Sequence, residues 1–286
     1  MAYGLGAALG FVADRGGPRI KRDWPIYLRI QFLATAAAAG LFSAWGLTAP
    51  RQIVAPIIIA GTGFVLLGAS YLTRRASSGG QAALDAWAAY PNTAFWVLPI
   101  AEALAGTAGA RIATLSNAAY SAPGAAAIHL LRRDAPHPQR RATFWIDQSS
   151  ALAVVVGLFL HLAGPAPSAA RWVLVGSGPA LAFVGAALFV GSVLHPHNER
   201  DPEQPSGVPR WAALTAVRVA CLVPLAVFTY SKDVAVVAVL CAFGPPAFNP
   251  SQLAVLYRYR SNVVYAAARW SWVLLPVGFA TAVAIR

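Results

Sequence analysis

The chain has 286 residues, of which 58% are hydrophobic and only 11% are charged. A soluble domain carries about 25% charged residues, so this composition excludes an ordinary water-facing surface and favours an integral membrane protein. The net charge of +12 would suggest a nucleic-acid partner in a soluble protein, but here the basic residues lie between long apolar runs, where they orient membrane helices.

Apolar segments follow one another along the whole chain, separated by short polar stretches. Most contain about 20 residues, the length that an α-helix needs to cross the hydrocarbon core of a bilayer. Helices are expected because a segment in lipid must satisfy its own backbone hydrogen bonds. The predicted fold is therefore all-α, with about ten transmembrane helices at residues 2–13, 24–46, 52–73, 84–106, 109–131, 143–163, 170–194, 210–230, 233–256 and 262–284.

The first apolar segment, residues 2–13, is shorter than the others. Its positive charges follow the apolar stretch, whereas the charges of a signal peptide precede it. We therefore interpret this segment as a short or truncated first transmembrane helix.

Lys and Arg residues are distributed unequally between the two alternating sets of loops. Fourteen of them lie in one set, and five lie in the other: Arg51, Arg111, Arg171, Lys232 and Arg286. The positive-inside rule makes the rich side cytoplasmic, so both termini are expected outside the cell. The excess of Arg over Lys is typical of a GC-rich bacterial genome, and we expect a multi-pass protein of the bacterial plasma membrane.

A short basic loop at residues 132–142 divides the chain into two parts with five apolar segments each, residues 1–131 and 143–286. A half with five spans ends on the side of the membrane opposite to its start. The second half must therefore enter the membrane inverted relative to the first. Two inverted five-helix repeats are the usual plan of a secondary transporter.

Prolines interrupt the fourth and the ninth apolar segments, which occupy matching places in the two halves. The fourth contains Pro91 and Pro99, and the ninth contains the run Gly244–Pro245–Pro246 followed by Pro250. Each proline removes a backbone donor, so helices are expected to break there. A matched pair of broken helices points to a transport site, with Asn92 and Asn249 beside the breaks as its polar groups. The alternative is that the prolines only kink helices for packing.

Three stretches of the chain resemble the auxin efflux carrier family of membrane transport proteins. They are PNTAFWVLPIAEALAG at 91–106, FGPPAFNPSQLAVLYRYR at 243–260, and the apolar region at 150–191. The first two resemble the broken helices of that family, each with an asparagine, a proline and a helix of small residues. Ala94 and Trp96 stand where the family usually has glycines.

This resemblance implies ten helices in two inverted halves, with the broken helices of the fourth and ninth spans crossing at mid-membrane. It also implies organic anions such as dicarboxylates or indole acids as substrates. The residues carried over as the binding site are Asn92, Pro99, Pro246 and Asn249. The wider superfamily includes carriers of the bile-acid type, which are coupled to a cation.

Basic residues inside the apolar segments are costly to insert into lipid and therefore suggest function. Arg218 lies eight residues beyond Arg210, about 12 Å deeper along a helix, and is expected to attract an anion from the cytoplasm. Arg29 and Arg269 lie less deep and either add positive potential to an inner vestibule or extend to the membrane interface.

Three acidic residues lie within or near the predicted spans. Asp147 either pairs with Arg218 or Arg141, or carries a proton that couples transport to the proton gradient. Glu102, three residues after Pro99, is either a protonatable gate or a carboxylate at the outer interface. Asp85, close to the cytoplasmic end of its segment, is expected at the membrane interface.

Motifs of the common catalytic sites are absent from the sequence. There is no phosphate-binding loop, no H-E-x-x-H and no G-x-S-x-G, so neither an ATP-driven pump nor a known hydrolase is expected. We predict no enzyme activity, no cofactor and no metal site.

The function that these features predict is secondary active transport of a small organic anion by alternating access. The alternatives are a cation-coupled symporter of the bile-acid type, or a membrane enzyme or sensor that moves no solute. The expected partners are the anion, the lipid bilayer, protons as a coupling ion and a second copy in a homodimer, but not nucleic acid.

Overall fold

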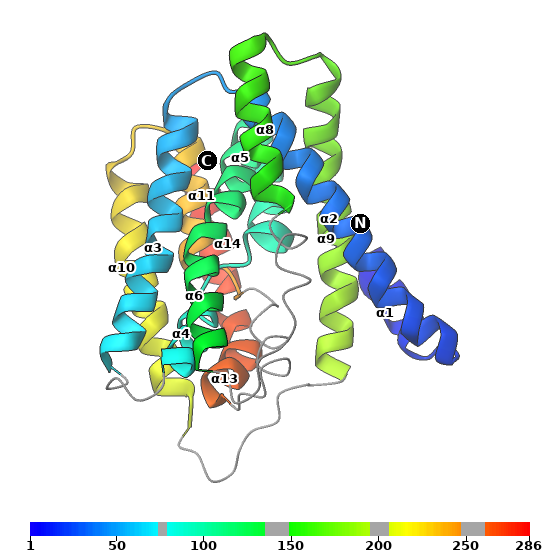
Figure 1. Ribbon diagram of the computed structural model, residues 1–286, viewed down its shortest axis with the longest axis vertical. Coiled ribbons are helices and arrows are strands. Elements are labelled where there is room, and N and C mark those ends of the chain that lie inside the picture. The colour runs from blue at the N-terminus through cyan, green and yellow to red at the C-terminus, as the bar shows by residue number, and fades with distance from the viewer. Residues whose placement is uncertain (74–78, 135–148, 195–205, 247–260) are drawn as a thin grey trace.

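The computed structural model describes residues 1–73, 79–134, 149–194, 206–246 and 261–286 (Figure 1). These residues form helices and no strand. The helices are α1 (Ala2–Asp14), α2 (Pro18–Trp45), α3 (Arg51–Thr73), α4 (Gly79–Trp87), the π-helix η1 (Thr93–Val97), α5 (Leu98–Ala119), α6 (Ser121–Arg133), α8 (Ser149–Ala163), α9 (Ala169–Leu194), α10 (Val208–Phe228), α11 (Lys232–Phe243), α13 (Asn262–Trp270), the 3-10 helix η3 (Ser271–Val273) and α14 (Leu275–Ile285).

Five of the described helical stretches are long and apolar enough to cross a membrane, or six if α13 to α14, bent by 47°, counts as one. The composition-based prediction of an all-α membrane protein agrees with this finding. The count of ten stays a prediction, because α1 and α8 are shorter and the proline-interrupted segments do not form continuous helices.

Helix α5 contains a sharp reversal at Gly106, where φ is +60° and ψ is −151°. A Cβ atom placed on Gly109 would lie 2.6 Å from the carbonyl oxygen of Ala101. Residues eight apart in a straight helix are separated by about 12 Å, so the chain turns back on itself here. Gly106 makes this turn because glycine adopts positive φ without steric cost. The turn coincides with the boundary predicted between segments 84–106 and 109–131.

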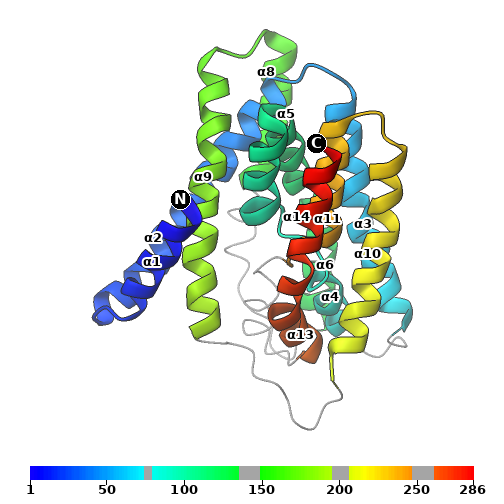
Figure 2. The same cartoon turned by 180° about the vertical axis from the view of Figure 1, so that it is seen from behind.

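The helices gather into two groups on either side of α5 (Figures 1 and 2). One group contains α1, α2, α8 and α9, in which α1 packs on α9 and α2 packs on α8 and α9. The other contains α3, α4, α6, α10, α11, α13 and α14. Helix α5 contacts α2, α8 and α9 of the first group and α3 and α11 of the second.

Glycines bring the backbones of the first group into direct contact. Gly6 and Gly10 of α1 face the backbone of α9 at Phe183 and Ala187, and Gly157 of α8 faces the backbone of α2 at Leu41. Small residues allow this approach, which membrane helices use because lipid supplies little hydrophobic driving force for their association.

Helix α11 lies at the centre of the second group. Every residue from Val234 to Ala242 is buried. A helix that is apolar on all sides belongs inside a protein, so this segment is surrounded by other helices rather than exposed on one face.

Asp134, which follows α6, holds the first turn of α4. One of its carboxylate oxygens accepts a 2.7 Å hydrogen bond from the backbone N–H of Gly80, and the other lies 2.8 Å from Nε of Arg133. The Arg133 hydrogen bond is the main reason that the pKa of Asp134 is lowered below its ordinary value, with the Gly80 bond adding to it. A carboxylate beside a helix N-terminus also interacts favourably with the helix dipole.

The lowered pKa makes the contribution of Asp134 to stability depend on pH in a defined direction. The ionised carboxylate stabilises the folded state above its unfolded pKa of about 3.9, and this contribution disappears as the pH falls through the lower folded value. We expect Asp134→Asn to lower the thermal midpoint at pH 6, and we expect this deficit relative to the unmodified protein to shrink as the pH falls below about 4. A deficit that stays constant over this range would contradict the assignment.

Candidate functional site

The two proline-interrupted segments meet at one point inside the second group of helices. Pro91 and Pro246 form an isolated antiparallel bridge, and the N–H of Asn92 donates a 2.8 Å hydrogen bond to the carbonyl of Pro245. Helix α4 ends at Trp87 and α11 ends at Phe243, so both breaks lie directly before this contact. We call the contact of residues 91–92 with 245–246 the crossing.

Asn92 begins the helix that leaves the crossing. Its side-chain oxygen accepts a 3.1 Å hydrogen bond from the N–H of Phe95, and its carbonyl accepts from the N–H groups of Trp96 and Val97. An asparagine at this position caps a helix by satisfying one of its free amides. The side chain is buried, and its other polar atom, Nδ2, has no partner among the described residues.

Trp96, four residues after Asn92, carries a second unused donor. Its Nε1 is also buried and has no hydrogen-bond partner in the described part of the chain. Asn92 caps the first turn after the crossing and Trp96 lies within it, so both unpaired N–H donors belong to the start of the helix that leaves the crossing. Buried donors without partners are rare in folded proteins and are costly unless a ligand or water satisfies them.

Aromatic rings pack against Trp96 and its neighbour Phe95 and connect this turn to α1 and α2. The ring of Tyr3 stacks on Trp96 at 4.8 Å and its hydroxyl donates to the carbonyl of Phe95. Trp272 meets Trp96 edge-on at 4.9 Å, and Phe32 lies 4.9 Å from Phe95. The bulk that the sequence places after Asn92 therefore forms an aromatic wall between the two helix groups.

Arg218 of α10 is buried and binds both broken ends. Its Nη1 donates to the carbonyl of Ala89, its Nε to Ala242 and its Nη2 to Gly244, at 2.7, 3.0 and 2.8 Å. The sequence predicts that this side chain attracts an anion, whereas the three partners found here are backbone carbonyls. No carboxylate pairs with Arg218 among the described residues.

Pro99 and Glu102 continue the helix beyond the crossing. Pro99 is the second residue of α5, which directly follows η1, so the helix continues through it and the break predicted at Pro99 does not form. The carbonyl of Phe95, four residues earlier, accepts from the hydroxyl of Tyr3. Glu102 is half-buried against α9, where a Cβ on Gly178 would overlap its carboxylate. Of the other predicted site residues, Asn249 and Asp147 lie outside the described residues.

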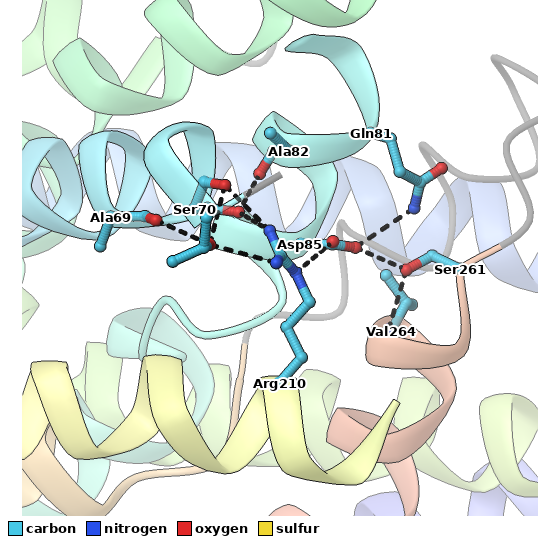
Figure 3. A network of polar contacts seen from close by, with 9 residues as sticks. Ala69, Ser70, Gln81, Ala82, Asp85, Arg210, Ser261 and Val264 are labelled. Carbon is cyan, nitrogen blue, oxygen red and sulfur yellow. Dashed lines mark hydrogen bonds and ion pairs between the residues drawn. The ribbon is translucent and has the colours of Figure 1, made fainter. Parts of the chain in front are cut away.

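Asp85, in the last turn of α4, belongs to a second polar cluster (Figure 3). Its carboxylate has no exposed surface and lies 2.8 Å from Nε of Arg210, while its other oxygen accepts from the hydroxyl of Ser261. Arg210 also donates to Thr73 and to the carbonyl and hydroxyl of Ser70. The position of Asp85 at the membrane interface stays a prediction, and within the protein its carboxylate is enclosed by partners from distant parts of the chain, Arg210 of α10 and Ser261.

Arg29 and Arg269 are exposed, and Nη1 of Arg269 donates to the hydroxyl of Tyr265 at 2.6 Å. A cavity of about 280 Å³ between α10, α11 and α14 has an apolar lining that includes Val223, Val239 and Phe243. None of the predicted site residues that the structure describes lines it. Within the described residues, no three His, Cys, Asp or Glu side chains lie close enough to hold a metal ion.

Sequence alone could not identify Tyr3, Trp96 or Ser261 as neighbours of these sites. Tyr3 lies in the short first helix and Ser261 begins α13, both distant in the chain from the residues that they contact. The sequence gives one signal for Trp96, which is a bulky side chain at a place where the family pattern has glycines. Models of protein families, curated proteins and solved structures were all compared with this chain, and none of them matches it.

Proposed function

We propose that this protein is a secondary active transporter that carries a small organic anion across the membrane by alternating access. The observation that carries the proposal is the crossing of two interrupted helices with unpaired N–H donors beside it. Backbone that is not helical at membrane depth is tolerated where it is enclosed by protein or lines a cavity, and transporters use such points to bind substrate.

The donors beside the crossing suit an oxyanion. Asn92 Nδ2 and Trp96 Nε1 can only donate, and they lie where the helix that continues into α5 begins, at the positive end of its dipole. A carboxylate would accept from both, and the aromatic wall would contact an apolar or planar remainder of the substrate. Asn249 of the second broken segment and a proton carried by Asp147 or Glu102 complete the proposed site and its coupling.

The helix pairing supports two inverted halves, residues 1–131 and 143–286, joined by 132–142. In this division α1 and α2 are the first and second spans of one half, and α8 and α9 are those of the other. The contact of α1 with α9 then has its counterpart in the contact of α8 with α2. These four helices would form the scaffold against which the crossing group moves, with both termini outside the plasma membrane. A carrier of this plan needs no enzymatic step.

The proposal is tested with purified protein in liposomes, by recording currents on a solid-supported membrane for a panel of monocarboxylates, dicarboxylates and indole acids. We expect a saturable current for at least one acid. Asn92→Asp keeps the capping oxygen but replaces the amide donor by a negative charge, so the current should be lost while the protein stays folded. Asn249→Ala tests the second segment in the same way.

Trp96→Phe provides a finer test because it removes one N–H donor and keeps an aromatic ring. A hydrogen bond to a charged group contributes about 1.5–3 kcal/mol, so the half-saturating anion concentration should rise about tenfold or more. Trp24→Phe is the matched control, since Trp24 of α2 also has a buried Nε1 without a partner but does not lie at the crossing. Folded protein without current for any acid would reject the anion carrier, and an equal effect of both Trp variants would reject the role of Trp96.

A further inference from the structure

The carbonyls that surround Arg218 all belong to the two interrupted segments. Ala89 follows the last turn of α4, Ala242 lies in the last turn of α11, and Gly244 directly follows that helix. In a continuous helix the carbonyl of Ala242 would accept from the residue four positions later, but that residue is Pro246, which has no N–H. The amide of Thr93, four positions after Ala89, donates to Pro91 instead. Arg218 therefore supplies donors that the interrupted backbone lacks.

The partial charges of these backbone carbonyls also match the positive charge of the Arg218 guanidinium. The carboxyl end of a helix carries about half a negative charge, and α11 and the end of α4 both present carbonyls to the same side chain. Together they balance about one positive charge. In the described residues no acidic side chain contributes to this balance, so the guanidinium is neutralised by backbone alone.

Carbonyls from unwound backbone and from the carboxyl ends of half-helices are the groups that bind a coupling cation in transporters with broken helices. We propose that the carbonyls of Ala89, Ala242 and Gly244 form a monovalent-cation site that the guanidinium of Arg218 permanently occupies. The cation is covalently attached, so its local concentration does not depend on the ions in solution. The crossing then keeps its geometry without sodium or potassium.

If the proposed transport function holds, the consequence is that anion flux needs no alkali cation, and this inference rests on that proposed function. A carrier with a fixed cation at the crossing differs in this respect from a symporter of the bile-acid type. The cation site itself is a property of the folded protein and can be tested whether or not the chain carries an anion.

The first experiment measures the thermal midpoint of the purified protein with sodium, methylguanidinium or choline at millimolar concentrations. We expect Arg218→Ala to lower the midpoint by about 5 °C or more, and added methylguanidinium to restore part of it with saturation. Choline should have no such effect, and the unmodified protein should respond to none of the three ions. Arg269→Ala, which removes an exposed arginine, is the matched control and should show neither the loss nor the rescue.

Two further variants keep the test decisive if Arg218→Ala does not fold. Arg218→Lys retains a cation and Arg218→Gln retains neutral N–H donors, so the Lys variant should have the higher midpoint. An equal or higher midpoint for the Gln variant would overturn the cation site, as would rescue of Arg218→Ala by choline.

A third measurement compares the currents of the unmodified protein in sodium and in choline. Equal currents are expected, and a requirement for sodium would overturn the inference while leaving the proposed transport intact. Absence of all current would reject the proposed transport and would leave the thermal measurements to decide on the cation site.

Discussion

Asp85→Ala is expected to lower the free energy of unfolding by about 3–5 kcal/mol, because it leaves Arg210 without its carboxylate inside the protein. The substitution also removes the acceptor of the Ser261 hydroxyl and of the Gln81 amide, so the start of α13 and the first part of α4 lose a common anchor. Unfolding in mixed micelles with increasing denaturant provides the measurement.

A second Arg–Asp pair in the same protein offers a matched control. Arg133 and Asp134 have the same 2.8 Å separation of Nε and carboxylate oxygen, but their side chains are 57% and 24% exposed, against 23% and 0% for Arg210 and Asp85. Exposed pairs contribute little, since water already solvates both charges. Arg133→Ala should therefore lower the free energy of unfolding by less than about 1 kcal/mol, much less than Asp85→Ala. Comparable losses in the two variants would show that burial does not determine the strength of the Asp85 pair.

The double variant Asp85→Ala with Arg210→Met separates the cost of an orphaned charge from the value of the pair. Replacing both partners of a buried pair by apolar residues is often close to neutral, whereas removing one is not. We expect the double variant to be more stable than Asp85→Ala alone. A double variant at least as unstable as the sum of the two single variants would mean that the polar network itself, rather than the unpaired charge, determines the loss.

Proline chemistry explains why the sequence predicts the interruptions so well. A proline removes a backbone donor, and α4 and α11 end close before Pro91, Pro245 and Pro246, although the single prolines Pro56, Pro179 and Pro224 lie inside α3, α9 and α10. The hydrophobic lengths likewise predict most helix positions, and Gly106 ends its segment at the expected place. These features depend on residues that are close together in the chain.

Contacts between distant residues could not be predicted in the same way. A buried arginine in an apolar segment indicates that some group must neutralise it, and an anionic ligand is as consistent with the sequence as a set of carbonyls. Arg218 reaches Ala89 across 129 positions and Gly244 across 26. Asp85 has the same difficulty, because its place near a segment end does not indicate that Arg210, 125 residues away, covers its carboxylate.

Gly157→Ala is expected to destabilise the protein by about 1–3 kcal/mol, although alanine is the better helix former. Its new methyl group would overlap the carbonyl of Leu41 and would lie 2.9 Å from Cβ of Ala44. Because the carbonyl belongs to the backbone of α2, no side-chain rotation can relieve the overlap, and α2 and α8 must move apart. The loss would be measured as a shift of the denaturant midpoint in mixed micelles.

Gly176 of α9 is the matched control, since a methyl group there would meet nothing within 4 Å. Gly176→Ala should leave the stability unchanged or raise it by up to about 1 kcal/mol, the difference in helix propensity. A loss of stability in Gly157→Ala together with a gain in Gly176→Ala would distinguish the effect of close backbone packing from that of intrinsic helix propensity. If Gly157→Ala is also stabilising, the contact of α2 with α8 is not fixed by its glycine, and the proposed scaffold of α1, α2, α8 and α9 would lose the rigidity that alternating access requires.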